Sequence, residues 1–236
     1  MPTVLITGAN RGIGLEHARA YAAAGWQVLA CARDPAASTA LQALASQYGS
    51  AVQPLKLDVT HHAGVEALAN ELKDTTIDVL LNNAGTFGPA GAPEGMSYQS
   101  LTNMDYQIWR QILEVNLLSP FKVAVAFCEH LRRAERPLLV MMSSDLGAIS
   151  QNTQGGSYAY RSSKAALNMV SKGMALEWPD IIVIAMAPGW CKTDLGGDIA
   201  PIDPVDSVRD QQHAFEELTL EQSGCFIDRF GEEVAW

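Results

Sequence analysis

Residues 3–14, TVLITGANRGIG, join an apolar run to a turn that contains Gly8, Gly12 and Gly14. The run is typical of a buried strand, and the apolar spacing from 12 to 24 indicates a helix. Glycines between such elements allow a tight turn and a close backbone approach, and a helix N-terminus favours a pyrophosphate. The stretch therefore predicts the opening strand, turn and helix of a dinucleotide-binding sheet. Taken alone, it leaves open a glycine-rich turn that binds no ligand.

The same alternation of strand and helix continues along the chain. Further strands are expected at 27–31, 52–57, 77–81, 137–142, 181–186 and 224–227. Helices are expected at 12–24, 37–48, 61–73, 105–133, 158–178 and 205–220. Most strand runs are apolar throughout, which is typical of parallel strands that helices cover on both faces. We therefore expect residues 1–236 to form a single domain, an α/β Rossmann fold with a doubly wound, seven-stranded parallel sheet.

The composition narrows the classes of partner. Of the 236 residues, 48% are hydrophobic and 18% are charged, which suits a compact core. The net charge of −10 disfavours non-specific binding to nucleic acid, although it does not exclude a phosphorylated ligand. The pair His61-His62 is expected to start a helix, and no residues have the spacing of a metal site.

The distribution of apolar residues bears on location. The N-terminus enters a strand without a basic leader, and apolar runs such as IIVIAMAP at 181–188 are shorter than the ~20 residues that cross a membrane. We therefore expect a soluble, cytoplasmic protein with no membrane partner.

Two arginines bear on which nucleotide would bind. An acidic residue is expected after the second strand of an NAD site, but ACARDP places Arg33 there. Arg33, with Arg11 in the glycine turn, suits the 2′-phosphate of NADP(H), which we favour over NAD(H). Two ordinary surface arginines are the alternative.

Other strand ends carry polar or small residues. LDVT at 57–60 includes Asp58, which could accept from an adenine amino group, and NNAG at 82–85 lets a strand end pass close to a cofactor. The segments 85–104 and 188–204, rich in Gly, Pro and Asp, also follow strands. Both should lie at the carboxyl edge of the sheet, where open α/β folds bind ligands.

The stretch GGSYAYRSSKAALN at 155–168 suggests proton transfer. Tyr160 precedes Lys164 by four residues and shares a helix face with it, whereas Tyr158 faces away. A lysine ammonium beside a tyrosine can lower its pKa toward a useful range, although such a pair is also common by chance.

Two polar features accompany this pair. MMSSDLG at 141–147 places Ser143 and Ser144 at a strand end, where a hydroxyl can face a carbonyl oxygen. Asn116 sits among apolar residues in EVNLLSPF and should bind water or backbone.

Together these motifs and the segment APGWCKTD closely resemble the short-chain dehydrogenase/reductase family over essentially the whole chain. The similarity is greatest to its C-factor and sniffer-type carbonyl reductases. The resemblance implies a catalytic tetrad of Asn116, Ser144, Tyr160 and Lys164. Ser144 would hold the substrate oxygen, Tyr160 would pass a proton to or from it, Lys164 would bind the nicotinamide ribose, and Asn116 would hold a relay water.

The resemblance also implies the residues that contact the cofactor. These are Gly8, Asn10, Arg11, Gly12, Ile13, Gly14, Arg33, Asp58, Val59, Asn83, Ala84, Gly85, Tyr160, Lys164, Pro188, Gly189 and Thr193. A homodimer or homotetramer built on the helices of Asn116 and Tyr160 is implied as well, although core packing explains their apolar faces equally.

The resulting hypothesis is an NADP(H)-dependent oxidoreductase that transfers hydride between the nicotinamide and a carbonyl or alcohol substrate. The alternative is a C-factor-like nucleotide-binding signalling or regulatory protein with dispensable catalysis. An apolar substrate pocket could be lined by Phe87, Met96, Leu146, Ile149, Trp190 and Leu195. Each of these could equally pack against its own loop, and the motifs do not decide the substrate or the reaction direction.

Overall fold

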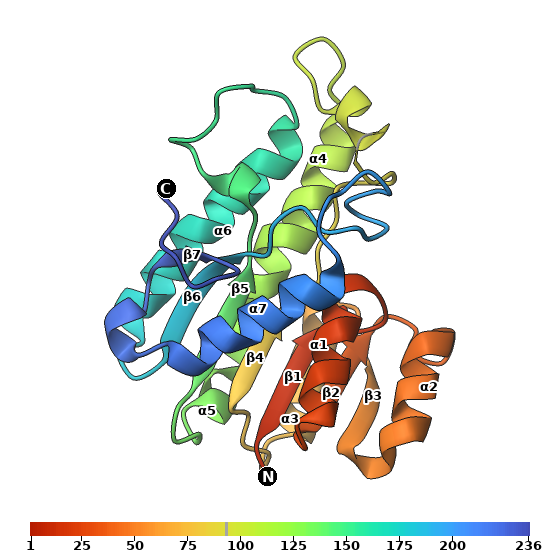
Figure 1. The fold of residues 1–236 in the computed structure, drawn as a ribbon, viewed down its shortest axis with the longest axis vertical. Helices are drawn as coiled ribbons and strands as arrows, with labels where there is room; N and C mark the ends of the chain where they lie inside the picture. Colours follow the sequence, from red (N-terminus) through yellow and green to blue (C-terminus); the bar gives the residue numbers. More distant parts are fainter. Residues whose placement is uncertain (93) are drawn as a thin grey trace.

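The protein forms one central sheet with helices on both sides (Figure 1), and the computed structural model describes residues 1–92 and 94–236. The strands are β1 (Thr3–Thr7), β2 (Gln27–Ala32), β3 (Val52–Lys56), β4 (Val79–Asn82), β5 (Leu138–Met142), β6 (Ile182–Ala187) and β7 (Phe226–Asp228). The α-helices are α1 (Gly12–Ala23), α2 (Thr39–Tyr48), α3 (His62–Glu71), α4 (Tyr106–Leu113), α5 (Ser119–Leu131), α6 (Tyr158–Glu177) and α7 (Pro204–Glu217).

The seven strands lie in the order β3-β2-β1-β4-β5-β6-β7, and every neighbouring pair is parallel. This is the doubly wound sheet that the sequence predicts, and the fold prediction is confirmed. The direction of winding reverses between β1 and β4. Ligands bind such sheets at that reversal, beyond the carboxyl ends of the strands. The turn after β1 lies at this place.

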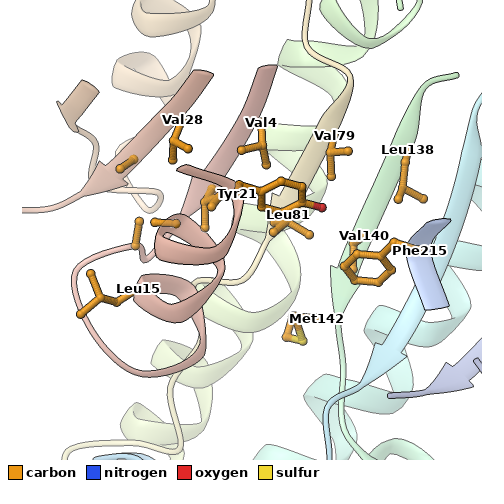
Figure 2. Packing of buried hydrophobic residues seen from close by; sticks show 14 of the residues in the cluster. Val4, Leu15, Tyr21, Val28, Val79, Leu81, Leu138, Val140, Met142 and Phe215 are labelled. Atoms are coloured by element: carbon orange, nitrogen blue, oxygen red, sulfur yellow. The ribbon is translucent and has the colours of Figure 1, made fainter. Parts of the chain in front are cut away.

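The two faces of the sheet have separate cores because successive strand residues point to opposite sides. Val4 and Ile6 belong to the cluster covered by α1, α2 and α7, whereas Leu5 belongs to the one covered by α3, α5 and α6. Figure 2 shows the first cluster, where Tyr21 of α1 and Phe215 of α7 lie over the valines and leucines of the strands. Fully burying each such aliphatic side chain contributes about 1.5–3 kcal/mol, so both faces hold the strand ends in place.

The long helix expected at 105–133 is divided in the structure. Asp105 caps α4 by accepting from Gln107 N and Ile108 N at 2.8 and 3.0 Å. A π-helical turn, Glu114–Leu118, then separates α4 from α5. Pro120, near the start of α5, has no N–H to donate to the carbonyl of Asn116, which accounts for the wider turn. Turns of this kind are frequent at functional sites.

The same helical run bears on the expectation that no segment crosses a membrane. Within the described part of the chain, Tyr106–Leu131 is the one helix long and apolar enough to cross a membrane by length and composition. The expectation concerned uninterrupted apolar runs, and it stands because charged residues such as Arg110, Glu114 and Lys122 interrupt this helix. In the structure Val123, Phe127 and Leu131 of this run are fully buried in the core under the sheet. Core packing therefore explains the apolar side chains on the buried face of this run.

Candidate active site

The turn after β1 is built for close packing. Gly8 and Gly12 have φ of +68° and +53°, which favour glycine. At Gly14 a Cβ would lie 2.3 Å from the Gly8 carbonyl oxygen and 2.4 Å from Asn83 Nδ2. Asn83 Nδ2 donates to the carbonyl oxygens of Thr7 and Gly8 at 2.9 and 3.3 Å. The NNAG segment at the end of β4 thus holds the backbone of the glycine turn through the side chain of Asn83.

Two hydroxyl residues that the sequence did not single out complete this turn. Thr7 Oγ1 accepts from the backbone N–H groups of Asn83 and Ala84, both at 3.0 Å, and so joins the ends of β1 and β4. Ser38, which caps α2, donates to the carbonyl of Asn10 at 3.0 Å. The threonine stands inside the quoted TGANRGIG motif. Ser38 was recognisable only as a possible helix cap.

The charged residues proposed for a phosphate lie at the same edge. Arg33 follows β2 and is exposed. It lies close enough to Asp58 to help lower the pKa of that carboxyl. Burial alone would raise this pKa, but the Thr60 hydroxyl and amide, together with Arg33 and His61, outweigh it. Arg11 forms an ion pair with Asp194 at 2.5 Å, with both side chains more than half exposed. The glycine turn is therefore tied to the 188–204 segment, a contact the sequence did not predict.

The side chains of Tyr160 and Lys164 come together on α6 as their spacing predicts. Both are nearly fully buried, and Lys164 Nζ lies 5.6 Å from the centroid of the Tyr160 ring. Lys164 Nζ donates to the carbonyl of Met142, at the end of β5, at 2.7 Å. Tyr158 instead lies beside Gly155, where a Cβ would be 3.6 Å from its hydroxyl. The geometry therefore separates the two tyrosines in the way the helical period does.

The serine pair after β5 is divided in the same manner. Ser143 is buried, and its hydroxyl donates to Asn168 Oδ1 at 2.5 Å. Ser144 is half-buried, accepts from Leu146 N at 3.2 Å and lies close enough to the Tyr160 hydroxyl to act on its pKa. The Ser143 hydroxyl is thus occupied by a buried hydrogen bond, whereas Ser144 faces the tyrosine.

Burial controls the pKa values of the pair. It raises the pKa of Tyr160 to about 12, an effect that the neighbouring Ser144 hydroxyl opposes and Asp145 increases. Burial lowers the pKa of Lys164 to about 8. We expected the lysine to lower the tyrosine pKa, but the net direction in the structure is upward. The physical reason is that burial dominates, while the ammonium is bound to the Met142 carbonyl.

Asn116, in the π-helical turn, is fully buried and bonded to backbone, one of the two partners expected for it. Its Oδ1 accepts from Thr86 N at 2.8 Å and its Nδ2 donates to Thr86 O at 2.9 Å. Nδ2 also donates to Ser163 Oγ at 3.0 Å, and Ser163 Oγ donates to the carbonyl of Tyr160 at 2.7 Å. A Cβ at Gly85 would lie 3.5 Å from Asn116 Oδ1 and 3.7 Å from Lys164 Nζ. Asn116 therefore joins the segment after β4 to α6.

The proposed apolar pocket residues divide into two sets. Phe87, Leu146 and Leu195 pack in one cluster with Tyr160, and the Phe87 ring lies 4.7 Å from the tyrosine ring. Met96, Ile149 and Trp190 are exposed and lie outside that cluster. Trp190 Nε1 donates to Gly196 O at 2.8 Å, so this side chain packs on its own loop. Three of the six residues predicted to line the substrate pocket therefore pack against Tyr160.

The segments 85–104 and 188–204 meet at the carboxyl edge of the sheet, opposite the N-terminus in Figure 1. Ala92 N donates to Leu195 O at 2.9 Å. Pro188 and Gly189 follow β6, and a Cβ at Gly12 would lie 3.2 Å from the methyl of Thr193. Val59 and Ile13 turn their side chains into the core, so they offer mainly backbone to this edge.

This arrangement defines the class of protein. A parallel sheet of this order, with a glycine turn at the reversal and a tyrosine–lysine pair beyond β5, is that of a Rossmann-fold oxidoreductase. The family model described as short chain dehydrogenase matches residues 2–202. The chain belongs to that family, and the resemblance seen in its motifs is confirmed.

Individual relatives and solved structures are similar to most or all of the chain. The C-signal of Myxococcus xanthus is 35% identical over 174 residues, which are 73% of this chain and 100% of that protein. The carbonyl reductase Sniffer of D. melanogaster superposes with a TM-score of 0.90 at 31% identity, covering 100% of both chains. NADPH-bound carbonyl reductase from chicken fatty liver gives a TM-score of 0.89 at 30% identity, covering 100% of this chain and 99% of the other.

Proposed function

We propose that this protein is an NADP(H)-dependent oxidoreductase that transfers hydride between the nicotinamide and a carbonyl or alcohol substrate. Tyr160 is the general acid or base. The observation that carries the proposal is the buried Tyr160 beside Ser144, one helical turn from Lys164. The likeness to an NADPH-bound carbonyl reductase supports the choice of cofactor and of reaction.

The residues at the sheet edge fit a dinucleotide. The turn at Gly8, Gly12 and Gly14 leaves no room for a Cβ at Gly14, so backbone lines the approach to α1. Its N–H groups and the helix N-terminus would hold the pyrophosphate. Arg33 and Arg11 would take the 2′-phosphate, provided that Arg11 leaves Asp194.

The remaining contacts follow the strand ends. Asn10 and Ile13 belong to the glycine turn, and Asp58, Val59, Asn83, Ala84 and Gly85 would line the adenosine side. Pro188, Gly189 and Thr193 would line the nicotinamide end, with Tyr160 and Lys164 at the ribose. When bound, NADPH supplies the hydride.

The protein's own side chains would supply the proton that the substrate oxygen takes up. At neutral pH Tyr160 carries its proton, as an ordinary tyrosine does, and burial holds that proton more firmly by raising its pKa to about 12. It can therefore donate to a carbonyl oxygen that gains negative charge as it is reduced. Ser144 would hold the same oxygen by a hydrogen bond, and the Lys164 ammonium would stabilise the tyrosinate that remains. Asn116 would hold a water that returns a proton to the lysine side of the site.

The substrate class follows from the wall around the tyrosine. Phe87, Leu146 and Leu195 present apolar atoms there, so an aldehyde or ketone with an apolar substituent would bury the most surface. Reduction is the direction that the protonated tyrosine serves directly.

A panel of carbonyl compounds with NADPH tests the proposal, with consumption of NADPH followed by its near-ultraviolet absorbance. Turnover of at least one apolar aldehyde or ketone is expected, and Tyr160→Phe should lose nearly all of it. Full activity in Tyr160→Phe, or none in the wild type, would overturn the assignment. Arg33→Asp should shift the preference from NADPH toward NADH, and an unchanged preference would remove the 2′-phosphate role of Arg33.

We further propose that the chain is a single folding unit that acts in the cytoplasm as a homodimer or homotetramer. Large apolar side chains are exposed on α5 and α6, namely Phe121, Val125, Met169 and Leu176. Isolated exposed apolar residues are ordinary, but two neighbouring helices that both carry them suit an interface between copies. Sedimentation of the wild type against Phe121→Glu measures this, and a wild type that stays monomeric contradicts it.

A signalling role is the second candidate, and the 35% identity to a protein named C-signal favours it. The two roles are separable by one variant. If Tyr160→Phe still performs the cellular role of the gene, catalysis is dispensable and the protein acts as a nucleotide-binding regulator.

A further inference from the structure

The helix that carries Tyr160 begins without a local cap. The first N–H groups of any helix lack partners inside it, and the residue before the helix usually supplies one through its side chain. Here that residue is Ser157, whose side chain makes no such bond. Ser157 has a φ of 45° and follows Gly155 and Gly156, which are also left-handed. Among the described residues it is the one non-glycine residue with positive φ. Such a backbone conformation is unfavourable by itself, so the surrounding structure holds it in place.

The missing cap is supplied from a distant segment by Gln99. The backbone carbonyl of Gln99 accepts from Tyr158 N at 3.2 Å. Its side-chain Oε1 accepts from Tyr160 N at 2.8 Å. Gln99 is fully buried although it is a polar residue in an irregular segment. One residue thus satisfies two of the unpartnered donors at the start of α6, and one of these donors belongs to Tyr160 itself.

The amide nitrogen of Gln99 binds the segment that carries Phe87, the apolar residue beside Tyr160. Gln99 Nε2 donates to the carbonyl oxygen of Phe87 at 2.8 Å and to that of Gly95 at 3.2 Å. The ring of Phe87 lies 4.7 Å from the ring of Tyr160, with an angle of 35° between them. The amide therefore binds the backbone of both aromatic residues, with its oxygen accepting from Tyr160 and its nitrogen donating to Phe87 as well as to Gly95. No side chain with only donors or only acceptors could replace it.

We propose that Gln99 is a positioning residue for proton transfer: it fixes the start of α6 and the Phe87 segment together, and so sets where the Tyr160 hydroxyl stands. This rests on the proposed role of Tyr160 as acid or base. The hydrogen bonds of the Gln99 side chain all go to backbone atoms, so it acts through Tyr160 and Phe87. A small displacement of a reacting group lowers rates steeply, with 1 Å costing as much as about 100-fold.

Gln99→Met tests the proposal, because methionine has a similar length and offers neither the acceptor nor the donors. The matched control is Asn103→Leu. Asn103 Nδ2 also donates to a backbone carbonyl of the same segment, that of Ser97 at 2.8 Å, but within the described part of the chain it makes no hydrogen bond to α6. Gln99→Met is expected to lower kcat for a carbonyl substrate by about 10- to 100-fold. KM for NADPH should stay near the wild-type value, and the control should behave as the wild type does.

A conservative variant separates positioning from folding. Gln99→Glu keeps an acceptor for Tyr160 N and, when protonated, one donor for the Phe87 segment. Its kcat is expected to lie between those of the wild type and Gln99→Met. If Gln99→Met does not fold, this variant carries the test. A kcat equal to that of the wild type in the folded variants, or an equal loss in Asn103→Leu, overturns the proposal.

A readout without turnover distinguishes this proposal from the function it rests on. Hydrogen exchange of the Tyr160 amide, measured by NMR, should be faster in Gln99→Met than in the wild type and unchanged in Asn103→Leu. If the wild type reduces no carbonyl, the proposed function fails, and the positioning of Tyr160 is then judged by this exchange alone. Unchanged exchange at Tyr160 would overturn the positioning.

Discussion

Gly14→Ala is expected to destabilise the protein, although alanine is the better helix former by up to about 1 kcal/mol. A Cβ at this position would lie 2.3 Å from the Gly8 carbonyl oxygen and 2.4 Å from Asn83 Nδ2, where 3.4 Å is an ordinary contact. Relieving the overlap requires a shift of the turn, and overpacking of this kind costs about 1–3 kcal/mol. Displacing Asn83 also weakens its bonds to Thr7 and Gly8, at about 1 kcal/mol each. The net loss should be about 2–4 kcal/mol.

Thermal unfolding measures this loss. For a domain of this size, 1 kcal/mol shifts Tm by about 2–4 °C, so a fall of about 5–15 °C is expected by calorimetry or circular dichroism. Gly173→Ala is the control, because Gly173 lies in α6 and a Cβ there meets no heavy atom within 4 Å. That variant should gain up to about 1 kcal/mol from helix propensity. If both variants shift Tm in the same direction, the steric reasoning about the glycine turn is wrong.

Three further outcomes are expected. Ser144→Ala should lower kcat by about 10²- to 10³-fold, as loss of one preorganised donor does. Ser143→Ala should keep turnover and lose about 1–3 kcal/mol of stability, because Asn168 then lacks its donor; kinetics and denaturation of both variants check this, and equal kinetic losses contradict it. The free energy of unfolding of the wild type relative to Lys164→Met should rise between about pH 8 and 10.5, since burial lowers the lysine pKa from 10.5 to about 8 and only the unfolded chain binds that proton in this window. A relative stability that falls there in pH-dependent denaturation would be inconsistent with a buried ammonium. Asp194→Asn should tighten NADPH binding by up to about fivefold at low salt, less at high salt, because exposed ion pairs contribute about 0.2–1 kcal/mol and this one occupies Arg11. Titration of NADPH fluorescence measures it, and weaker binding would show that Asp194 supports the cofactor.

The fold was predictable because its signals are local. The apolar run at 3–7 coincides with β1, and the glycine turn lies where the winding of the sheet reverses. The helical period also placed Tyr160 beside Lys164 and turned Tyr158 away. Each of these features depends on residues close together in the chain, so spacing alone carries the information.

Other parts of the site were not predictable for the opposite reason. The π-helical turn at Asn116 arises from a proline four residues later, and the apolar spacing of 105–133 reads smoothly across it. Gln99 and Asp194 matter only because their segments fold onto α6 and the glycine turn. A polar residue in an irregular segment looks solvent-exposed in sequence, and only the tertiary contacts show that Gln99 is buried.

The direction of the pKa shift at Tyr160 is a consequence of the same tertiary contacts. Phe87 and the segment held by Gln99 cover the ring, so water is excluded and burial raises the pKa of the phenol to about 12. The ammonium that could oppose this is itself buried, with a pKa lowered to about 8, and is bound to a backbone carbonyl. A tyrosine in this environment keeps its proton until a developing negative charge on a bound oxygen takes it. The apolar cover at Phe87 therefore holds the proton on Tyr160 more firmly than water would, which is the state that the proposed reduction needs.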